Sequence, residues 1–298
     1  MPTLFAISGF LLSSRIRRGW GDARTRFSVA HSLYLYAIWL LIYAIVAPWF
    51  PTGAQPLSTA DGWIGLGAQF VNPHTMLWFI LGLAFWTAAL AAVRFLPVWV
   101  ILPVLFVVAV LSLEIEWVTQ ADFYIRILRY GFYFAVGVYL RPALERAINE
   151  YVWITAGCSL AVYVIVRFAA PVENILGMSV SVLTPLRDLS AVALAMSALA
   201  AIVTHVSVVR VPLVWVGERT LPVYVLHSLV IWTIVKIPGW SAVVQLPIQK
   251  YVAPVVWTAI VALICIGIYA LALKTPARYL FDMPDAWRAV LRRDNVSA

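Results

Sequence analysis

The sequence predicts an all-α fold, a polytopic bundle of transmembrane helices. Of the 298 residues, 63% are hydrophobic and only 11% are charged, and the mean hydropathy is +0.93. A soluble domain carries about a quarter of its residues as charges, so the lipid bilayer must solvate much of this chain. The apolar runs are long and continuous, without the alternation of barrel strands. Because lipid offers the backbone no hydrogen-bond partners, we expect these runs to be helices.

About nine runs are long enough to cross a bilayer, which takes roughly 20 apolar residues. They lie at 1–14, 28–50, 74–94, 97–113, 124–140, 151–169, 188–208, 213–236 and 250–273. The stretch 170–187 is polar and bounded by prolines, so we predict a loop there. Residues 1–273 then form a membrane-embedded domain. Residues 274–298 form a basic amphipathic tail, in which DAWRAVLRRD is predicted to be a short helix lying on the inner leaflet.

Most of the basic residues fall on one side of the predicted bundle, whereas Arg126 and Arg129, near the outer end of the fifth segment, go against this trend. The residues on the basic side are Arg15, Arg17, Arg18, Arg24, Arg26, Arg94, Arg141, Arg146, Arg210 and Arg219, with Lys274, Arg278, Arg288, Arg292 and Arg293 in the tail. The opposite connections are poor in basic residues, and 114–123 is acidic. The positive-inside rule therefore puts the C-terminus in the cytoplasm. It also accounts for the net charge of +8, so no nucleic-acid partner is expected.

The two cysteines give no metal-ligand spacing and no disulfide framework. Cys158 and Cys265 both lie within apolar runs, far apart in the chain. We expect them to pack as small hydrophobic residues, and no metal site is predicted.

The first segment, MPTLFAISGF, is apolar from its start. Nine alternating spans with a cytoplasmic C-terminus place Met1 outside, and no basic residue precedes the run as it would in a signal peptide. One further helix before Met1 would give ten spans with both termini inside. We therefore expect that the chain as written begins one helix late.

Four stretches stand out along the chain. In order, they are PTLFAISGFLLSSRIRR, HTMLWFILGL, RYGFYFAVGVYL and GERTLPVYVLHSLVIW. In this order and spacing they resemble the membrane-bound acyltransferase family 3, and among its members the fucose 4-O-acetylase-like branch. The family shows P-L-F-F-F-I-S-G followed by arginines, then H-L-W-F-L, F-F-x-x-G and G-x-x-T-L-x-I-Y-x-x-H. The resemblance covers nearly the whole chain. It departs at the front, where the family's first helix, with its arginine and catalytic histidine, is absent, and at Glu218, where a small polar residue is usual.

The resemblance implies an O-acyltransferase of the bacterial inner membrane. The acyl group, for which acetyl is the favoured candidate, would pass from cytoplasmic acyl-CoA to a hydroxyl of a sugar, glycan or glycolipid on the extracytoplasmic side. Acyl-CoA is a co-substrate, and no permanently bound cofactor is implied. The lipid bilayer is the remaining partner, with a homodimer left open.

Histidine is the natural base for acyl transfer to a hydroxyl, because its pKa lies near neutrality. His227 lies deep in the eighth segment, where an ionisable group is costly and suggests function. A structural hydrogen bond to Tyr224 or Ser228 explains it equally well. His74 opens the third segment on the outer side. With the family's base on the absent helix, His74 and His227 would orient the hydroxyl or relay its proton.

The predicted substrate-binding residues are of two kinds. Arg15, Arg17 and Arg18 suit the phosphates of CoA, because guanidinium groups bind phosphates in a bidentate manner, although the positive-inside rule alone also explains them. On the acceptor side we place Trp78, Tyr224, Glu114 and Arg129. Ser8 is not expected to be a nucleophile, because Ser-Gly pairs in spans mainly let helices approach and no nucleophile elbow surrounds it.

Two other functions remain open from the sequence. One is a non-catalytic homologue, shortened at the N-terminus, that acts as a membrane partner protein. The other is a transporter of a lipid-linked sugar, for which internal repeats with matching broken helices would be expected. No such repeat is visible.

Overall fold

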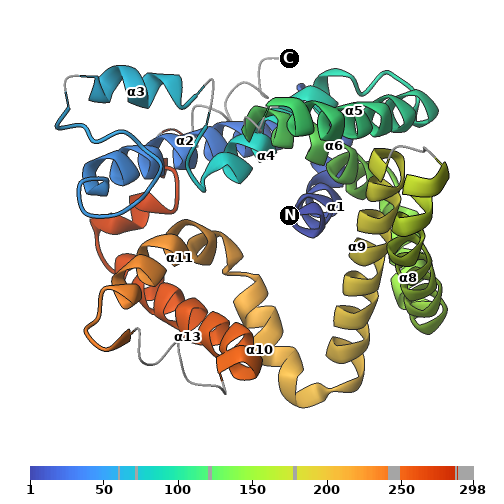
Figure 1. Ribbon diagram of the computed structural model, residues 1–298. Coiled ribbons are helices and arrows are strands. Elements are labelled where there is room, and N and C mark those ends of the chain that lie inside the picture. The colour runs from blue at the N-terminus through green and yellow to red at the C-terminus, as the bar shows by residue number, and fades with distance from the viewer. Residues whose placement is uncertain are drawn as a thin grey trace.

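The computed structural model describes residues 1–59, 61–70, 73–119, 123–176, 180–240, 249–285 and 287, and every regular element in these ranges is a helix (Figure 1). The all-α prediction is confirmed. The helices of the first part are α1 (Pro2–Arg18), α2 (Ala23–Val46), α3 (Gly62–Ala68), α4 (Trp78–Ala92), α5 (Val98–Thr119), α6 (Phe123–Tyr139) and α7 (Arg141–Asn149). Those of the second part are α8 (Val152–Leu176), α9 (Val180–His205), α10 (Ser207–Gly217), α11 (Thr220–Val235), α13 (Gln249–Ala272) and the 3₁₀ helix η1 (Pro276–Leu280).

Three helices in the described ranges are long and apolar enough to cross a membrane, which is compatible with a membrane protein. They are Ala23–Val46, Val182–His205 and Val255–Ala272. The pair Arg141–Asn149 and Val152–Phe168, bent by 109°, adds a fourth if it is one broken span. Trp78–Ala92, Val98–Leu113 and Thr220–Val235 are apolar but shorter. A helix thus lies in each of the nine predicted stretches, but a bundle of nine spans is not confirmed.

The loop predicted at 170–187 is wrong. Helix α8 continues to Leu176 and α9 begins at Val180, with Pro185 inside it. Arg187, at the end of this stretch, is paired: its guanidinium lies 3.0 Å from the Asp188 carboxylate, and the Tyr133 hydroxyl donates to Asp188 at 3.2 Å. Polarity alone was therefore a poor guide to the helix boundary.

The single span predicted at 213–236 is also wrong. Helix α10 ends at Gly217 and α11 begins at Thr220, with the adjacent charged residues Glu218 and Arg219 between them. The Arg219 side chain turns back to the Trp215 carbonyl at 2.8 Å. Pro222 falls in the first turn of α11, where a missing N–H group costs nothing. The same proline inside a continuous helix would break a backbone hydrogen bond, so a fresh helix start suits this sequence.

Helices α1 and α6 cross at backbone contact, and their glycines make this possible. A Cβ atom on Gly9 would lie 2.1 Å from the Phe134 carbonyl oxygen, and one on Gly137 would lie 2.0 Å from the Ala6 oxygen. Ser13 adds a hydrogen bond of 2.6 Å to the Val138 carbonyl. Small residues at helix interfaces allow this approach in membranes. The role predicted for the Ser-Gly pair in ISGF is confirmed at Gly9.

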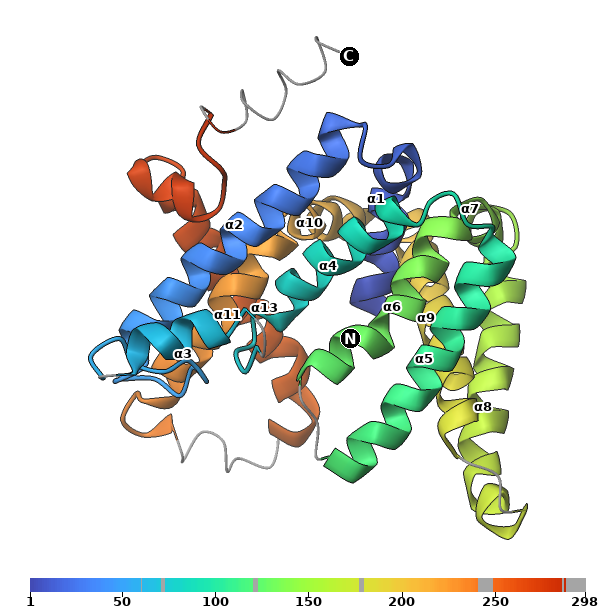
Figure 2. The ribbon, with the colours of Figure 1, turned by 90° about the horizontal axis from the view of Figure 1, so that it is seen from above.

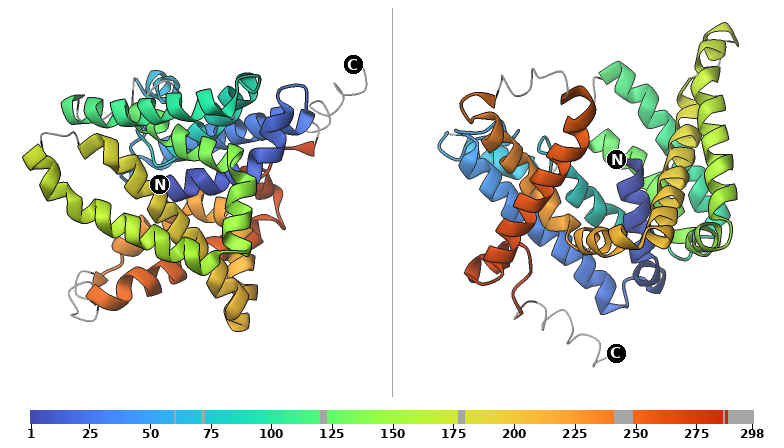
Figure 3. Two further views of the ribbon diagram at one scale, coloured as in Figure 1. Left: turned by 90° about the vertical axis from the view of Figure 1, so that its right-hand side faces the viewer. Right: turned by 90° about the horizontal axis from the view of Figure 1, so that it is seen from below.

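Helix α2 ties together distant parts of the chain (Figures 2 and 3). Tyr34 and Trp39 donate hydrogen bonds of 2.7 Å to the carbonyls of Tyr279 and Leu280. The start of the predicted tail is thereby held against α2, and the Phe281 ring packs 5.5 Å from Trp39. The predicted amphipathic helix beyond Trp287 lies outside the described residues.

Candidate functional site

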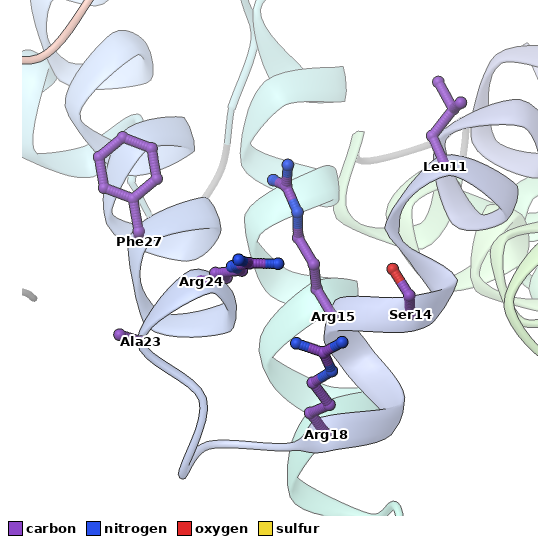
Figure 4. Close-up of a pocket in the computed structure, with 7 residues that line it drawn as sticks. All are labelled: Leu11, Ser14, Arg15, Arg18, Ala23, Arg24 and Phe27. Carbon is purple, nitrogen blue, oxygen red and sulfur yellow. The ribbon is translucent and has the colours of Figure 1, made fainter. Parts of the chain in front are cut away.

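A hollow lined by arginines lies where α1 ends and α2 begins (Figure 4). It has a volume of about 450 Å³ and is lined by Leu11, Ser14, Arg15, Arg18, Ala23, Arg24 and Phe27. Arg15 and Arg18 come from the last turn of α1, and Arg24 comes from the first turn of α2. Three guanidinium groups from two helices thus surround one space, an arrangement suited to phosphate groups. We call it the arginine hollow.

Local hydrogen bonds hold the arginine hollow in shape. Arg15 donates to the Ser28 hydroxyl at 2.9 Å, and Arg18 pairs with Asp22 at 3.3 Å. Asp22 caps α2 by accepting the Arg24 backbone N–H at 2.8 Å. This hydrogen bond, aided by the nearby Arg18, lowers the pKa of the Asp22 carboxyl below its ordinary value. Asp22 therefore stays ionised near neutral pH and partly offsets the charge of Arg18.

The hollow contains two of the three arginines predicted from the sequence. Arg17 does not line it and donates instead to the Tyr139 carbonyl at 3.0 Å. Arg24, which the sequence had suggested only as a marker of topology, takes the third place. A signal for this was present, because Asp22 is a good helix N-cap and a helix starting there turns Arg24 back toward α1.

His227 lies half-buried on α11, and its ring is oriented by its own helix. Nδ1 lies 2.6 Å from the Tyr224 carbonyl oxygen. A carbonyl only accepts, so Nδ1 carries the proton and Nε2 presents its lone pair. The Ser228 hydroxyl lies 3.3 Å from Nε2. The predicted structural hydrogen bonds to Tyr224 and Ser228 are thus both present, and Nε2 is the accepting nitrogen of the ring.

Tyr224 joins His227 to the segment that carries His74. Its hydroxyl donates to the Met76 carbonyl, and its ring lies 5.7 Å from the His227 ring. His74, two residues before Met76, is exposed, and its backbone N–H donates to the Gln69 side chain at 2.7 Å. The fold therefore brings the segments of both predicted histidines to one end of the molecule, which the sequence spacing alone does not reveal.

An aromatic layer connects these residues to α6. Successive ring centroids lie 5.4, 4.9 and 5.2 Å apart along Tyr130, Phe5, Phe79 and Tyr224. Trp78 packs into this layer, 5.6 Å from Tyr130 and 6.0 Å from Phe5. Its side chain is only 4% exposed, so Trp78 supports the site from within the core, and its predicted contact with substrate stays a prediction.

Arg129 lies partly buried on α6 beside this layer. Tyr130 and Tyr133 lie within electrostatic range of both Arg129 and Asp188. The sequence did not single out Asp188, because its contact with Tyr133 joins two helices that are far apart in the chain. The Glu114 side chain, also predicted to bind substrate, lies outside the described part of the structure.

The arginine hollow and His227 lie at opposite ends of α2. Ala23 lines the hollow, and the Tyr43 hydroxyl donates to the carbonyl of Val225, two residues from His227, at 3.2 Å. At 1.5 Å per residue, Ala23 and Tyr43 are about 30 Å apart. This is about the thickness of the hydrocarbon core of a bilayer.

Comparisons with family models, with curated proteins and with solved structures found no match to this chain. Among the described residues, no group of three or more His, Cys, Asp or Glu side chains is arranged to hold a metal ion. The function must therefore be argued from the arginine hollow, the histidine and the distance between them.

Proposed function

We propose that this protein is a membrane O-acyltransferase. It moves an acyl group from acyl-CoA in the cytoplasm to a hydroxyl of a sugar, glycan or glycolipid on the other side of the membrane. The favoured acyl group is acetyl. The proposal includes a bacterial inner-membrane location with the C-terminus in the cytoplasm. The four quoted stretches, which resemble membrane-bound acyltransferase family 3, support the proposal.

One observation carries the proposal: the arginine hollow and the His227 imidazole lie about a bilayer thickness apart along α2. The hollow belongs to the arginine-rich connection between α1 and α2, the side that the positive-inside rule assigns to the cytoplasm. His227 lies at the opposite end, near Tyr43.

The residues take distinct parts in the proposed reaction. Arg15, Arg18 and Arg24 hold the phosphates of CoA. The acceptor oxygen attacks the thioester carbonyl, the new C–O bond forms and the C–S bond breaks. The hydroxyl proton passes to an imidazole and then to the departing thiolate, which leaves as the free thiol of CoA. In the family the base is expected on a helix preceding the segment that matches α1, so His227 orients the hydroxyl or relays its proton through Nε2.

The test compares two histidines that both bond to their own helix. His227 bonds to Tyr224, and His205 on α9 bonds to the Ala201 carbonyl at 2.9 Å. Membranes containing each variant are incubated with radiolabelled acetyl-CoA, and ester-linked label is counted in the glycan and lipid fractions. His227→Ala should lower the label about 100-fold or more, the range for loss of proton transfer. His205→Ala should retain it.

The amount of folded protein in the membrane is measured for both variants, so that loss of protein is not mistaken for loss of transfer. Equal labelling in the parent and in His227→Ala would remove His227 from the reaction. Labelling no higher than in membranes without the protein would contradict the enzyme and favour the non-catalytic homologue.

A further inference from the structure

Helices α11 and α13 lie side by side (Figure 1). A pocket of about 590 Å³ opens between them, and His227 is part of its lining. It is lined by Val223, His227, Ile231, Ile234 and Val235 of α11, by Trp240, and by Trp257, Thr258, Val261 and Ala262 of α13. On each helix these positions form one stripe at helical spacing. The volume falls within the range of small-molecule sites. We call it the α11–α13 pocket.

The chemistry of this pocket is that of a hydrocarbon site. Among the described residues that line it, the only polar side-chain groups are the His227 ring, the Thr258 hydroxyl and the two indole N–H groups. Two tryptophans, Trp240 and Trp257, meet edge to face at 4.6 Å at one part of its wall. A sugar ring buried here would leave most of its hydroxyls without partners, at a cost of about 1 to 3 kcal/mol for each. An alkyl chain has no such requirement.

The pocket also lies where a lipid can reach it. Its α13 residues belong to Val255–Ala272, one of the three helices able to cross a membrane. On α11, the stripe from Val223 to Val235 is about 18 Å long at 1.5 Å per residue. One elongated chain therefore fits along the stripe, with His227 beside its first third.

We propose that the α11–α13 pocket holds the hydrocarbon chain of a lipid-linked acceptor, with the acceptor hydroxyl beside Nε2 of His227. This inference rests on the proposed acyl transfer and names its acceptor class as a glycolipid rather than a free sugar. The chain is assigned to the acceptor because the donor's anionic end lies about 30 Å away along α2, and an acetyl group has no chain to seat.

The test is photolabelling of the purified full-length protein in phosphatidylcholine nanodiscs with diazirine-bearing hexadecanol. Labelled peptides are mapped by mass spectrometry. We expect label on residues 220–240 and 255–272, and we expect dodecyl glucoside, but not glucose, to compete for it. Competition by palmitoyl-CoA without competition by dodecyl glucoside would assign the pocket to the donor and overturn the proposal.

Matched substitutions localise the label. Ala262→Trp fills the pocket and should abolish labelling of these peptides, whereas Ala259→Trp, on an exposed part of α13 outside the pocket, should leave it unchanged. Ile231→Trp fills the pocket from α11 at a side chain already 42% exposed, and serves if Ala262→Trp does not fold. Labelling that survives both pocket substitutions contradicts the proposal.

Photolabelling requires no turnover, so its outcome is separate from that of the proposed function. If no acyl transfer exists but the pocket is labelled, the enzyme assignment fails and the lipid site remains. If Ala262→Trp transfers acetyl groups as well as Ala259→Trp does, the pocket does not hold the acceptor, while the acyltransferase assignment remains.

Discussion

Two helix pairs of the fold pack in opposite ways. At the α1–α6 crossing, Gly9 and Gly137 bring backbones into direct contact, and Phe5, Ala6, Ile16 and Val138 are almost fully buried. Between α11 and α13, a pocket of about 590 Å³ is lined by larger side chains such as Ile231 and Trp257. The close pair is the less apolar one, because α1 carries three arginines and α11 carries no Lys, Arg, Asp or Glu, so apolar composition does not decide how closely two helices pack. The placement of small residues does, and it separates a structural crossing from a pair that can accept a ligand.

The largest effect is expected from adding a side chain at the close crossing. In Gly9→Leu, the new Cβ would lie 2.1 Å from the Phe134 oxygen, so the two backbones must separate. We expect a loss of about 3 kcal/mol of stability, at the upper end for overpacked sites, measured by unfolding in mixed detergent micelles.

The matched control makes the same substitution at an exposed position of α13. A Cβ on Gly267 of α13 meets nothing within 4 Å, and leucine is the better helix former. Gly267→Leu should therefore unfold at or above the detergent concentration of the parent. Equal destabilisation by the two substitutions would show that the close backbone contact at Gly9 is not the cause of the loss.

A smaller effect is expected at the arginine hollow, whose proposed ligand is anionic, whereas the proposed ligand of the α11–α13 pocket is a hydrocarbon chain. Replacing Arg15, Arg18 and Arg24 together by Gln should weaken acetyl-CoA binding about 10- to 100-fold, at up to about 1 kcal/mol for each exposed charge. It should leave hexadecanol labelling of the α11–α13 pocket unchanged. Equilibrium binding of radiolabelled acetyl-CoA measures the first effect.

Arg17→Gln is the control, because Arg17 lies outside the hollow. Binding to the unmutated protein should also weaken with added salt, since exposed charges are screened. An affinity unmoved by the triple substitution would leave these arginines as topology determinants only.

The smallest effect is expected from Asp22→Asn. Asparagine still caps a helix, but the negative charge beside Arg18 is lost. Acetyl-CoA affinity should rise about two- to fivefold, the worth of one exposed ion pair. Weaker binding by a folded variant would show that the carboxylate helps to form the hollow rather than opposing the ligand.

The Asp22 cap also makes the stability of the fold depend on pH. Its pKa is lower in the folded protein than the ordinary value of 3.8. The carboxylate therefore stabilises the fold above the unfolded-state pKa, and this contribution is lost as the pH falls through the folded-state pKa. Unfolding of the parent compared with Asp22→Asn between pH 6 and about pH 2 should show this loss only in the parent.

Much of the helix content was predictable from hydrophobic runs, because backbone hydrogen bonding in an apolar chain leaves few alternatives. Gly9 was predictable as a contact residue for the same kind of reason. The contacts that bring the residues of the candidate site together were not predictable. Asp188, the Trp78 packing and the approach of Tyr224 to Met76 depend on which helices are neighbours, and sequence spacing says nothing about that. The break at Glu218 was visible only as a charged pair before a proline.

The arginine hollow shows the same limit at close range. Its connection was correctly marked as basic, but the assignment of Arg17 rather than Arg24 followed from proximity in sequence. Successive residues of a helix are turned by about 100°, so Arg15 and Arg18 lie on nearly the same face of α1 and Arg17 lies on another. The start of α2 then supplies the third guanidinium.

The most direct test of the account is the side from which the donor enters. Inverted and right-side-out vesicles are prepared from cells that make the protein, and each is incubated with radiolabelled acetyl-CoA. Donor binding at the arginine hollow on the cytoplasmic face predicts ester-linked label in inverted vesicles alone, lost in His227→Ala and retained in His205→Ala. Equal labelling of both vesicle types, or label that does not depend on His227, would contradict it.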